Sequence, residues 1–448
     1  MKTRFRRRLV APFAAAGVIG LALAGCTGDI AAEQAEDVDC SDYEQYGSFD
    51  GAEVSVQGTI VEVEADRLIA SFAPFEQCTG VTVDYQGTQE FEANIEVLAQ
   101  GGNAPDLGIF PQPGLFQRLA RGGFFVEAPA DVESNVDEFW SEDWKAYGTV
   151  DGTFYGAPLM ASIKGYVWYS PSEFEENGWE VPTTLEELDA LSAQIAEESG
   201  HLPWCVGLGS DAATGWPGTD WVEDMVLRLH GPDVYDQWVN HEIPFNDPRI
   251  VEAFDAVGNY LKNDEYVNGG HGDVQSQLSV PFGEGGLPIL DGECSLHHQA
   301  SFYEGFWPEG TEIAEDGDIW AFITPPAAAD DPLAVTGGGE IVGAFADREE
   351  VQAFQTYLSS DLWANNRVAE GGVISANSGL DPSVASSELL SQSIEILQNP
   401  ETTFRFDGSD LMPGAVGADS FWTGIIDWIS GDSTQEVVDA IEASWPAS

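Results

Sequence analysis

VTVDYQGTQEFEANIEVLAQGGNAPDLGIFPQPGLFQRLA, residues 81–120, alternates between the period of a strand and the period of a helix. Residues 81–85 alternate β-branched and polar side chains, and residues 107–110 form a short apolar run, so both are predicted strands. Residues 91–98 and 115–120 carry helical spacing, and a Gly-Gly pair lies shortly after each of them. Strand, helix, strand, helix predicts an α/β fold with a parallel sheet whose two faces are covered by helices.

The remainder of the chain continues this mixture of strands and helices. An extended apolar run occupies residues 166–169, and Thr184 followed by Glu187 predicts the capped start of a long helix that ends near residue 198. Further helices are expected at 220–229, 249–261, 348–358, 387–397 and 434–443. No internal repeat is present in the sequence, and its length favours two or three domains.

The start of the chain has the composition of an export signal. A basic head with one lysine and four arginines precedes an apolar stretch, residues 9–23, and small residues then lead to Cys26. The tetrapeptide Leu-Ala-Gly-Cys resembles the bacterial lipobox, in which the cysteine is lipidated and becomes the first residue. We therefore expect a lipoprotein signal peptide at 1–25, lipidation of Cys26 and a flexible acidic tether at 26–47. A plain signal peptide with a chance cysteine is one alternative. A transmembrane anchor is another, which a proline and two glycines in the apolar stretch disfavour.

The charge balance excludes several classes of partner. Without residues 1–25 the chain carries 11 Lys and Arg against 77 Asp and Glu, a net charge of −66. Such a surface repels nucleic acid and anionic lipid headgroups, so neither is an expected partner and a membrane anchor must be covalent. Disordered chains are also highly charged, but 43% hydrophobic residues and 14 tryptophans provide apolar surface for large cores. The acid excess is consistent with a saline or alkaline habitat, or with simple colloidal solubility.

Motifs of common catalytic and metal sites are absent from the sequence. It has no Gly-Lys dipeptide and hence no phosphate-binding P-loop, no Gly-x-Ser-x-Gly elbow, no His-Glu-x-x-His and no Cys-x-x-Cys. His297 and His298 are adjacent, and neighbouring side chains on a strand point to opposite faces. Since no Cys or His lies nearby at ligand spacing, we expect neither a metal nor a cofactor.

Four stretches, taken in order, carry a resemblance to a known family. They are FEQCTGV (75–81) before GNAPDL (102–107), DGTFYGAP (151–158) before WYS (168–170), PWC (203–205) before ATGWPGTDW (213–221), and DLMP (410–413) before FWTGIIDW (421–428). Together they resemble the extracellular solute-binding proteins of carbohydrate ABC importers, of the maltose-binding type, with the α-glucoside-binding branch closest. Ser170 stands where the family usually has asparagine.

This resemblance implies a type II fold like that of periplasmic binding proteins, with two discontinuous α/β lobes joined by crossing strands and a hinge. We expect lobe one at 45–160 and 320–370, and lobe two at 161–319 and 371–448. A ligand between the lobes would stabilise their closure by hinge bending, as in periplasmic binding proteins generally. The implied partners are a carbohydrate and an ABC permease with a separate ATPase. The receptor is expected to be a monomer, lipid-anchored at the outer face of a bacterial cell membrane.

A sugar ring has apolar C–H faces and a belt of hydroxyls, so its receptor needs flat aromatic rings and planar polar groups. The resemblance assigns stacking to Trp216 and Trp422, and it places Phe110 and Gln112 at the carboxyl end of a strand, where open sheets bind ligands. The other candidates would meet the ligand from loops and crossing segments: Asp211, Glu90, Lys164, Gln299 and Phe302. Each has a structural alternative, such as ring packing in a core, coverage of apolar surface by a lysine stem, or an acid at a helix start or in solvent.

Four cysteines remain after Cys26, and three pairings are possible in an oxidising compartment. The implied lobes favour Cys205–Cys294, because both residues fall in lobe two. They also favour Cys40–Cys78, which would fasten the tether to the first helix. Four free buried thiols are the alternative.

The expected function is capture of a sugar, a di- or oligosaccharide such as an α-glucoside, without catalysis. One rival is a secreted glycoside hydrolase, because two carboxylates suffice for that chemistry. Another is a sugar-sensing lipoprotein of the same fold that takes no part in transport.

Overall fold

The first sheet contains the two strands predicted within residues 81–120 and has six strands in all. The structure is a computed structural model that describes residues 38–268 and 272–446. In this sheet β1 (Glu53–Gly58) pairs in parallel with β2 (Thr82–Gly87) and β3 (Leu107–Phe110). Its other strands come from distant parts of the chain: β6 (Gly156–Ile163), β12 (Ala334–Ala344) and β13 (Thr403–Phe406). The sheet is mixed rather than purely parallel, because β12 runs antiparallel to β3 and β6.

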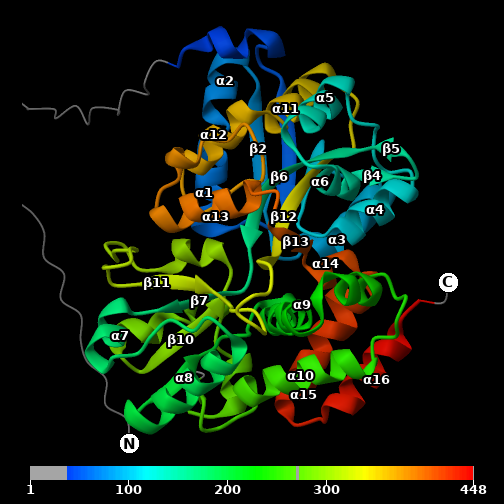
Figure 1. Ribbon diagram of the computed structural model, residues 1–448. Helices are drawn as coiled ribbons and strands as arrows, with labels where there is room; N and C mark the ends of the chain where they lie inside the picture. The colour runs from blue at the N-terminus through cyan, green and yellow to red at the C-terminus, as the bar shows by residue number, and fades with distance from the viewer. Residues whose placement is uncertain (1–37, 269–271, 447–448) are drawn as a thin grey trace, which may run out of the picture. The chain divides into compact units, whose positions relative to one another are not determined.

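Helices cover this sheet on two sides, with α1, α2 and α12 on one side of β2 and β6 and with α4, α5 and α6 on the other (Figure 1). Their bounds are α1 (Glu62–Ala70), α2 (Ala73–Thr79), α3 (Phe91–Gln100), α4 (Pro113–Arg121), α5 (Ala130–Phe139), α6 (Glu142–Tyr147), α11 (Glu349–Leu358), α12 (Asp361–Ala369) and α13 (Glu388–Gln398). Phe110 is fully buried, and its ring centroid lies 5.1, 5.7 and 5.4 Å from those of Phe91, Phe116 and Phe125. Burial of each such ring contributes about 1.5–3 kcal/mol, so this cluster fastens α3 and α4 to β3.

The second sheet has five strands in the order β11-β7-β10-β8-β9. They are β7 (Tyr166–Tyr169), β8 (Leu202–Cys205), β9 (Val267–Asn268), β10 (Cys294–Gln299) and β11 (Trp320–Ile323). The accompanying helices are α7 (Pro171–Asn177), α8 (Leu185–Glu198), α9 (Trp216–Val239) and α10 (Pro248–Leu261). The predicted cap is present, because the Thr184 side chain accepts a hydrogen bond from the backbone N–H of Glu187. The helix expected at 220–229 extends further, and it kinks at Gly231, just before Pro232.

The two sheets are connected through Lys164 and Gly165, which lie between β6 of the first sheet and β7 of the second. Gly165 has a φ of +78°, and a Cβ there would lie 2.6 Å from a carboxylate oxygen of Asp224. The tight turn between the sheets therefore requires glycine at this position. The carboxyl-terminal part adds α14 (Gly408–Leu411), α15 (Trp422–Ser430), α16 (Thr434–Ser444) and the π-helix η8 (Val416–Phe421).

Short elements complete the described part of the chain. A small hairpin pairs β4 (Thr149–Val150) with β5 (Thr153–Phe154). The 3₁₀ helices are η1 (Cys40–Tyr46), η2 (Asp211–Ala213), η3 (Val274–Leu278), η4 (Phe282–Glu284), η5 (Leu287–Asp291), η6 (Ser301–Phe306) and η7 (Pro382–Val384). None of the helices among residues 38–268 and 272–446 combines the length and the hydropathy that a membrane span requires.

The expected tether at 26–47 is too long at its carboxyl end. Residues 40–46 form η1, in which Tyr43 and Tyr46 are buried and pack against Tyr357. These aromatic rings bury apolar surface, which a freely moving linker does not do. The signal peptide at 1–25, Cys26 and the tether up to residue 37 lie outside the described residues.

The lobe boundaries remain a prediction, and the strand pairings suggest how to adjust them. Residues 320–323 form β11 and pair with β7 of the second sheet. Residues 403–406 form β13 and pair with β12 of the first sheet. We therefore propose that the second segment of lobe one begins after β11. We also propose that β13 belongs to lobe one.

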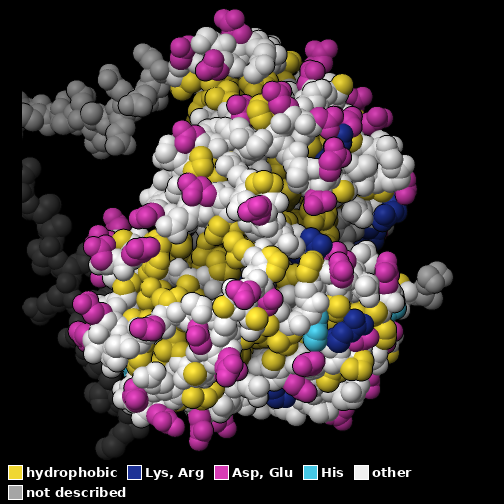
Figure 2. Space-filling model, viewed as in Figure 1, with side chains coloured by type: hydrophobic (Ala, Val, Ile, Leu, Met, Phe, Trp, Pro, Cys, Tyr) yellow, Lys and Arg dark blue, Asp and Glu magenta, His cyan; other side chains and the backbone are white. Residues whose placement is uncertain are grey.

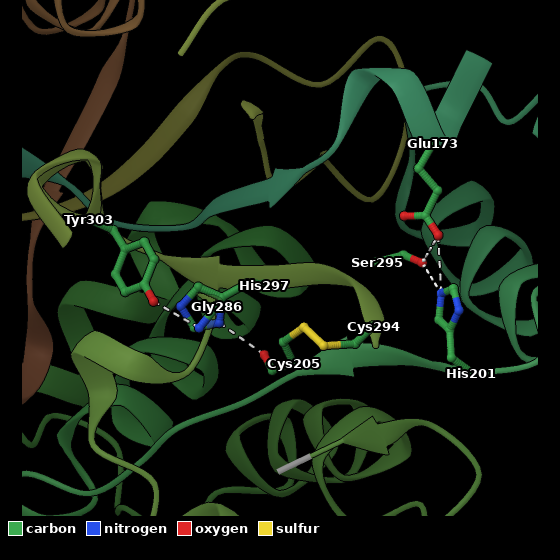
Figure 3. The surroundings of a disulfide bond; sticks show 8 residues. All are labelled: Glu173, His201, Cys205, Gly286, Cys294, Ser295, His297 and Tyr303. Atoms are coloured by element: carbon green, nitrogen blue, oxygen red, sulfur yellow. Dashed lines mark hydrogen bonds and ion pairs between the residues drawn. A yellow bond between two sulfur atoms is a disulfide. The ribbon is translucent and has the colours of Figure 1, made fainter. Parts of the chain in front are cut away.

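Both expected disulfides are present, Cys40–Cys78 and Cys205–Cys294. The second joins the neighbouring strands β8 and β10, and Figure 3 shows it between two hydrogen-bonded groups. On one side Tyr303 accepts a hydrogen bond from the backbone N–H of Gly286, and the Nδ1 atom of His297 lies 2.9 Å from the carbonyl oxygen of Cys205. The cross-link therefore belongs to the packed interior of the second sheet.

Acidic side chains are distributed over the whole visible face of the molecule, whereas Lys and Arg appear at few places (Figure 2). Hydrophobic side chains also gather in a hollow on this face. The excess of acid is therefore a property of the folded surface as well as of the composition.

Candidate functional site

A cavity of about 750 Å³ is lined by strand residues of the first sheet and by loops and helices next to strands of both sheets. This volume lies in the range of small-molecule sites. Its wall is built from short stretches far apart in sequence, within 59–67, 89–92, 111–112, 160–164, 210–216, 281–287, 302–306, 338–340 and 407–410, together with Val373 and Trp422. These stretches lie mostly at the ends of strands and the starts of helices, where open α/β sheets place their ligand sites.

Aromatic side chains form one part of this wall. Trp216, the first residue of α9, lies with its ring centroid 5.0 Å from that of Phe282 and 6.2 Å from that of Phe302. Gly215 precedes it with a φ of +111°, and a Cβ at that glycine would lie 2.4 Å from the carbonyl oxygen of Trp422. The backbone of α15 thus passes directly against the start of α9. This contact brings the two predicted stacking tryptophans to one cavity.

Lys164 lies beneath Trp216, with its ammonium 5.1 Å from the ring centroid. The ammonium donates a hydrogen bond to Asp220 at 2.9 Å and another to Asp407. Burial alone would lower the pKa of Lys164, but the two carboxylates raise it well above its usual value. The lysine is therefore charged, and it ties the turn between the sheets to α9 and to the end of β13.

The carboxyl groups around Lys164 do not all share one charge state. Burial raises the pKa of Asp220 and of Glu223 well above the usual range, and the nearby Asp407 adds to that rise. Burial acts on Asp407 too, but the charge of Lys164 and the hydrogen bonds with Glu223, Lys164 and Ser409 together outweigh it and hold the pKa of Asp407 well below the usual range. Glu223 also accepts hydrogen bonds from the backbone N–H groups of Gly408 and Ser409, at 2.7 and 3.0 Å, at the start of α14. The network therefore fixes α14 against α9.

Asp220, Glu223 and Asp407 bring carboxylate oxygens within 4.8 Å of one another, a spacing that suits a metal ion. The ammonium of Lys164, however, already lies between Asp220 and Asp407 as their cation. The cluster is thus explained by its own lysine. We propose no metal there, in keeping with the sequence expectation.

Six further acids line the cavity, and four of them form two pairs that act on each other by charge, Glu64 with Glu340 and Glu92 with Asp410. Burial raises the pKa of Glu92 and of Glu340 to about 7. Burial likewise raises the pKa of Glu64, and that of Asp410 well above its usual range, where Asp407 contributes further. Each pair offers acceptor oxygens to the cavity, as a ligand rich in hydroxyl groups requires.

Five of the nine predicted ligand residues line the cavity: Trp216, Trp422, Gln112, Lys164 and Phe302. The other four do not. Phe110 belongs to the core cluster described above, where its ring packs against three other phenylalanine rings. Gln299 is buried in β10, where its side-chain oxygen accepts a hydrogen bond from the next backbone N–H. Asp211 and Glu90 lie beside the wall, and only their neighbours Ser210, Ala213, Gln89 and Glu92 line it.

Sequence reasoning missed all the acids that line the cavity, and Arg67. In a chain with 77 Asp and Glu, a single cavity acid has no local signature. Two weak signals existed. Asp410 opens the DLMP stretch, and Glu340 directly follows three glycines, a place where backbone approaches closely.

Comparison with known proteins agrees with this geometry. Residues 58–361 match the family model described as bacterial extracellular solute-binding protein. The osmoprotective compounds-binding protein GgtB of Synechocystis sp. is 38% identical over 403 residues, 89% of this chain and 94% of that protein. The alpha-glucosides-binding periplasmic protein AglE of Rhizobium meliloti is 38% identical over 385 residues, 84% of this chain and 82% of that protein.

Solved structures show the same architecture. The solute receptor AcbH, whose structure is described as preferring β-D-galactopyranose, superposes with a TM-score of 0.74 at 16% identity, over 88% of this chain and 98% of that one. Maltose-bound MalE3 of T. maritima superposes with a TM-score of 0.66 at 15% identity, over 88% of this chain and 98% of that one. The expected two-lobed α/β fold of the maltose-binding type is thereby confirmed. The chain belongs to the bacterial extracellular solute-binding proteins, the extracytoplasmic receptors of ABC importers.

Proposed function

We propose that this protein is a lipid-anchored receptor that captures an uncharged glycoside and delivers it to an ABC permease. The ligand class is a di- or oligosaccharide or a sugar joined to a polyol, with an α-glucoside as the leading candidate. Its two relatives at 38% identity are named for osmoprotective compounds and for α-glucosides. The anchor is Cys26, on the evidence of the signal anatomy. A monomer is expected, and the permease and its ATPase are separate proteins.

One observation carries this proposal: the close contact of Gly215 with the backbone of Trp422 places Trp216 and Trp422 at one cavity, which is also lined by paired carboxyl groups. Aromatic rings bury the C–H faces of a sugar, and carboxylates accept its hydroxyls. A cavity of about 750 Å³ accommodates a disaccharide-sized ligand. Phe302, Gln112 and Lys164 are the remaining predicted ligand residues at this wall.

The mechanism we propose is closure around the ligand. A sugar that touches the first sheet and the loops next to the second sheet binds the closed form more tightly than the open form, and it shifts the population by that difference in affinity. The closed form is the one that docks on the permease. Glycosidic bonds stay intact, since the family and the solved neighbours are binding proteins.

The test is a thermal-shift screen of neutral mono-, di- and oligosaccharides and polyols, followed by calorimetry of the hits. We expect at least one α-glucoside or glycosyl polyol to bind with a dissociation constant in the micromolar range or below, and the radius of gyration to fall on binding. Released reducing ends during long incubation would indicate a hydrolase instead. Tight binding without delivery by a reconstituted permease would favour a sensor, and no hit at all would overturn the proposal.

A further inference from the structure

Glu340 occupies an irregular position in the first sheet. Strand β12 pairs with β6 through Gly339 and Ala161, and then through Ile341 and Pro158, with a register shift between them. Glu340 therefore faces two residues of β6 where a regular ladder has one. Such bulges re-aim a side chain and occur beside functional sites. The extra residue belongs to β6, and Met160 of this bulge lines the cavity together with Glu340, the single β12 residue opposite it.

Glu64 meets Glu340 from another element, the first turns of α1. Burial raises the pKa of both groups, and the charge of Glu64 raises that of Glu340 further. No side chain in the described part of the chain forms a hydrogen bond or an ion pair with either carboxyl group at contact distance. Both carboxyl groups therefore line the cavity with no side-chain donor of the described residues bound to them, so their oxygens are available to the donors of a ligand.

Two arginines partly offset the negative charge of Glu64 and Glu340 without forming an ion pair with either. Arg67 lines the same cavity, and Arg367 is only 1% exposed. Arg367 donates a hydrogen bond to the carbonyl oxygen of Gly371, whereas its Nε and Nη2 atoms are buried without a partner. Its charge acts on both Glu64 and Glu340. The arginines thus favour ionised carboxylates at this end of the cavity without using up their oxygens.

We propose that Glu340 and Glu64 are specificity-determining residues, which accept two hydroxyls of an uncharged polyol or sugar end and reject a ligand with a carboxylate in that place. The inference rests on the proposed function. A carboxylate binds a pair of neighbouring hydroxyls through its two oxygens. A ligand carboxylate would bring a third negative charge into a partly buried space and would supply no donor.

The experiment compares ligands that differ in one group. The reducing disaccharide that binds best in the screen is converted to its alditol, which ends in a neutral hydroxymethyl group, and to its aldonate, which ends in a carboxylate. We expect the alditol to bind within about 10-fold of the disaccharide and the aldonate at least about 100-fold more weakly than the alditol. The variant Glu340→Gln keeps the shape and removes the charge. It should bind the alditol about 10-fold more weakly and should discriminate against the aldonate by no more than about 10-fold.

Asp66→Asn is the matched control. Asp66 lies on the same helix as Glu64, is exposed and does not line the cavity, so its change removes one charge without touching the site. It should keep the affinities and the discrimination of the natural protein. Thermal unfolding confirms that Glu340→Gln is folded, and Glu64→Gln repeats the test from the other element. If sugars bind but both glutamine variants keep the natural discrimination, this inference is wrong and the proposed function stands. If no sugar or alditol binds the natural protein, both fail.

Discussion

The ammonium of Lys164 lies 5.1 Å from the centre of the Trp216 ring and is hydrogen-bonded to Asp220 and Asp407 on its other side. One buried side chain therefore supports an aromatic platform of the cavity and joins three segments that are far apart in sequence. Replacement of Lys164 by Met should leave the two carboxyl groups without their cation. We expect unfolding to become easier by about 3–5 kcal/mol, measured with urea, together with a loss of ligand affinity.

Lys262→Met is the control for this change. Lys262 also lies over a tryptophan, with its ammonium 5.0 Å from the ring of Trp428, but it is partly exposed and outside the main cavity. Its loss should cost less than about 1 kcal/mol. Equal effects of the two lysine changes would contradict the role assigned to Lys164. The double variant Lys164→Met with Asp407→Asn should be more stable than the sum of its single changes predicts.

The close approach of Gly215 to Trp422 makes a sharp prediction for a single methyl group. Gly215→Ala places a Cβ at 2.4 Å from the Trp422 carbonyl oxygen and forces alanine into a left-handed backbone conformation. We expect a loss of at least about 3 kcal/mol in unfolding free energy and weakened sugar binding. Gly178→Ala has a similar left-handed backbone with open space around it, so it should cost only about 1 kcal/mol. The comparison separates the contact from the backbone strain.

Removal of either tryptophan ring should weaken binding without unfolding the protein. Trp216→Ala and Trp422→Ala are each expected to lower sugar affinity about 10- to 100-fold, because a ring that covers a sugar face contributes roughly 1–3 kcal/mol. Calorimetry measures the change. Trp445→Phe is the control, since Trp445 stacks on His241 with centroids 4.0 Å apart and does not line the cavity. Unaltered affinity in both alanine variants would remove the basis of the sugar proposal.

The buried acid Glu92 should make stability depend on pH. Burial raises its pKa from 4.5 to about 7, so the folded state holds a proton that the unfolded state has released between these values. Stability contributed by this group is therefore present below pH 4.5 and is lost as pH rises towards 7. Glu92→Gln should raise unfolding free energy at pH 8 by about 1–3 kcal/mol and should change little at pH 4. Glu90→Gln, at an exposed position before the same helix, should show no such gain.

The acid surface predicts a response to salt. Residues 26–448 carry a net charge of −66, so self-repulsion opposes the compact state unless ions screen it. If the protein is adapted to a saline medium, its melting temperature should rise by several degrees between low and molar sodium chloride. A constant melting temperature would leave solubility as the reason for the acids.

Local patterns predicted much of the fold. The strands and helices within 81–120 appear at the expected places, because each buries one face against its sequence neighbours. The placement of β12 and β13 was beyond such patterns, since their partner strands are distant in the sequence and no local period indicates the pairing. The disulfides were predicted through the implied lobes, and both are present.

Site residues were predictable where a residue type suited to sugar binding stands in an unusual stretch of sequence or is rare in the chain. Trp216 and Trp422 stand in glycine-rich or family-like stretches, and Lys164 is one of few lysines. Phe110 is also an aromatic residue in a family-like stretch, but it packs in the core, because its strand is buried on both faces. Glu64 and Glu340 become a pair only when α1 meets β12 opposite the bulge in β6, a relationship that no pattern of neighbouring residues supplies.

The Cys40–Cys78 bond joins the first described helix to α2 and closes a covalent loop around β1 and α1. A pull on the chain from upstream of residue 40 can therefore pass through sulfur directly to α2. Strand β1 and the helix α1, which begins the cavity wall, lie inside the loop and are bypassed by the load. If the proposed lipid anchor at Cys26 places the chain under tension, Glu64 and Arg67 would therefore stay in place.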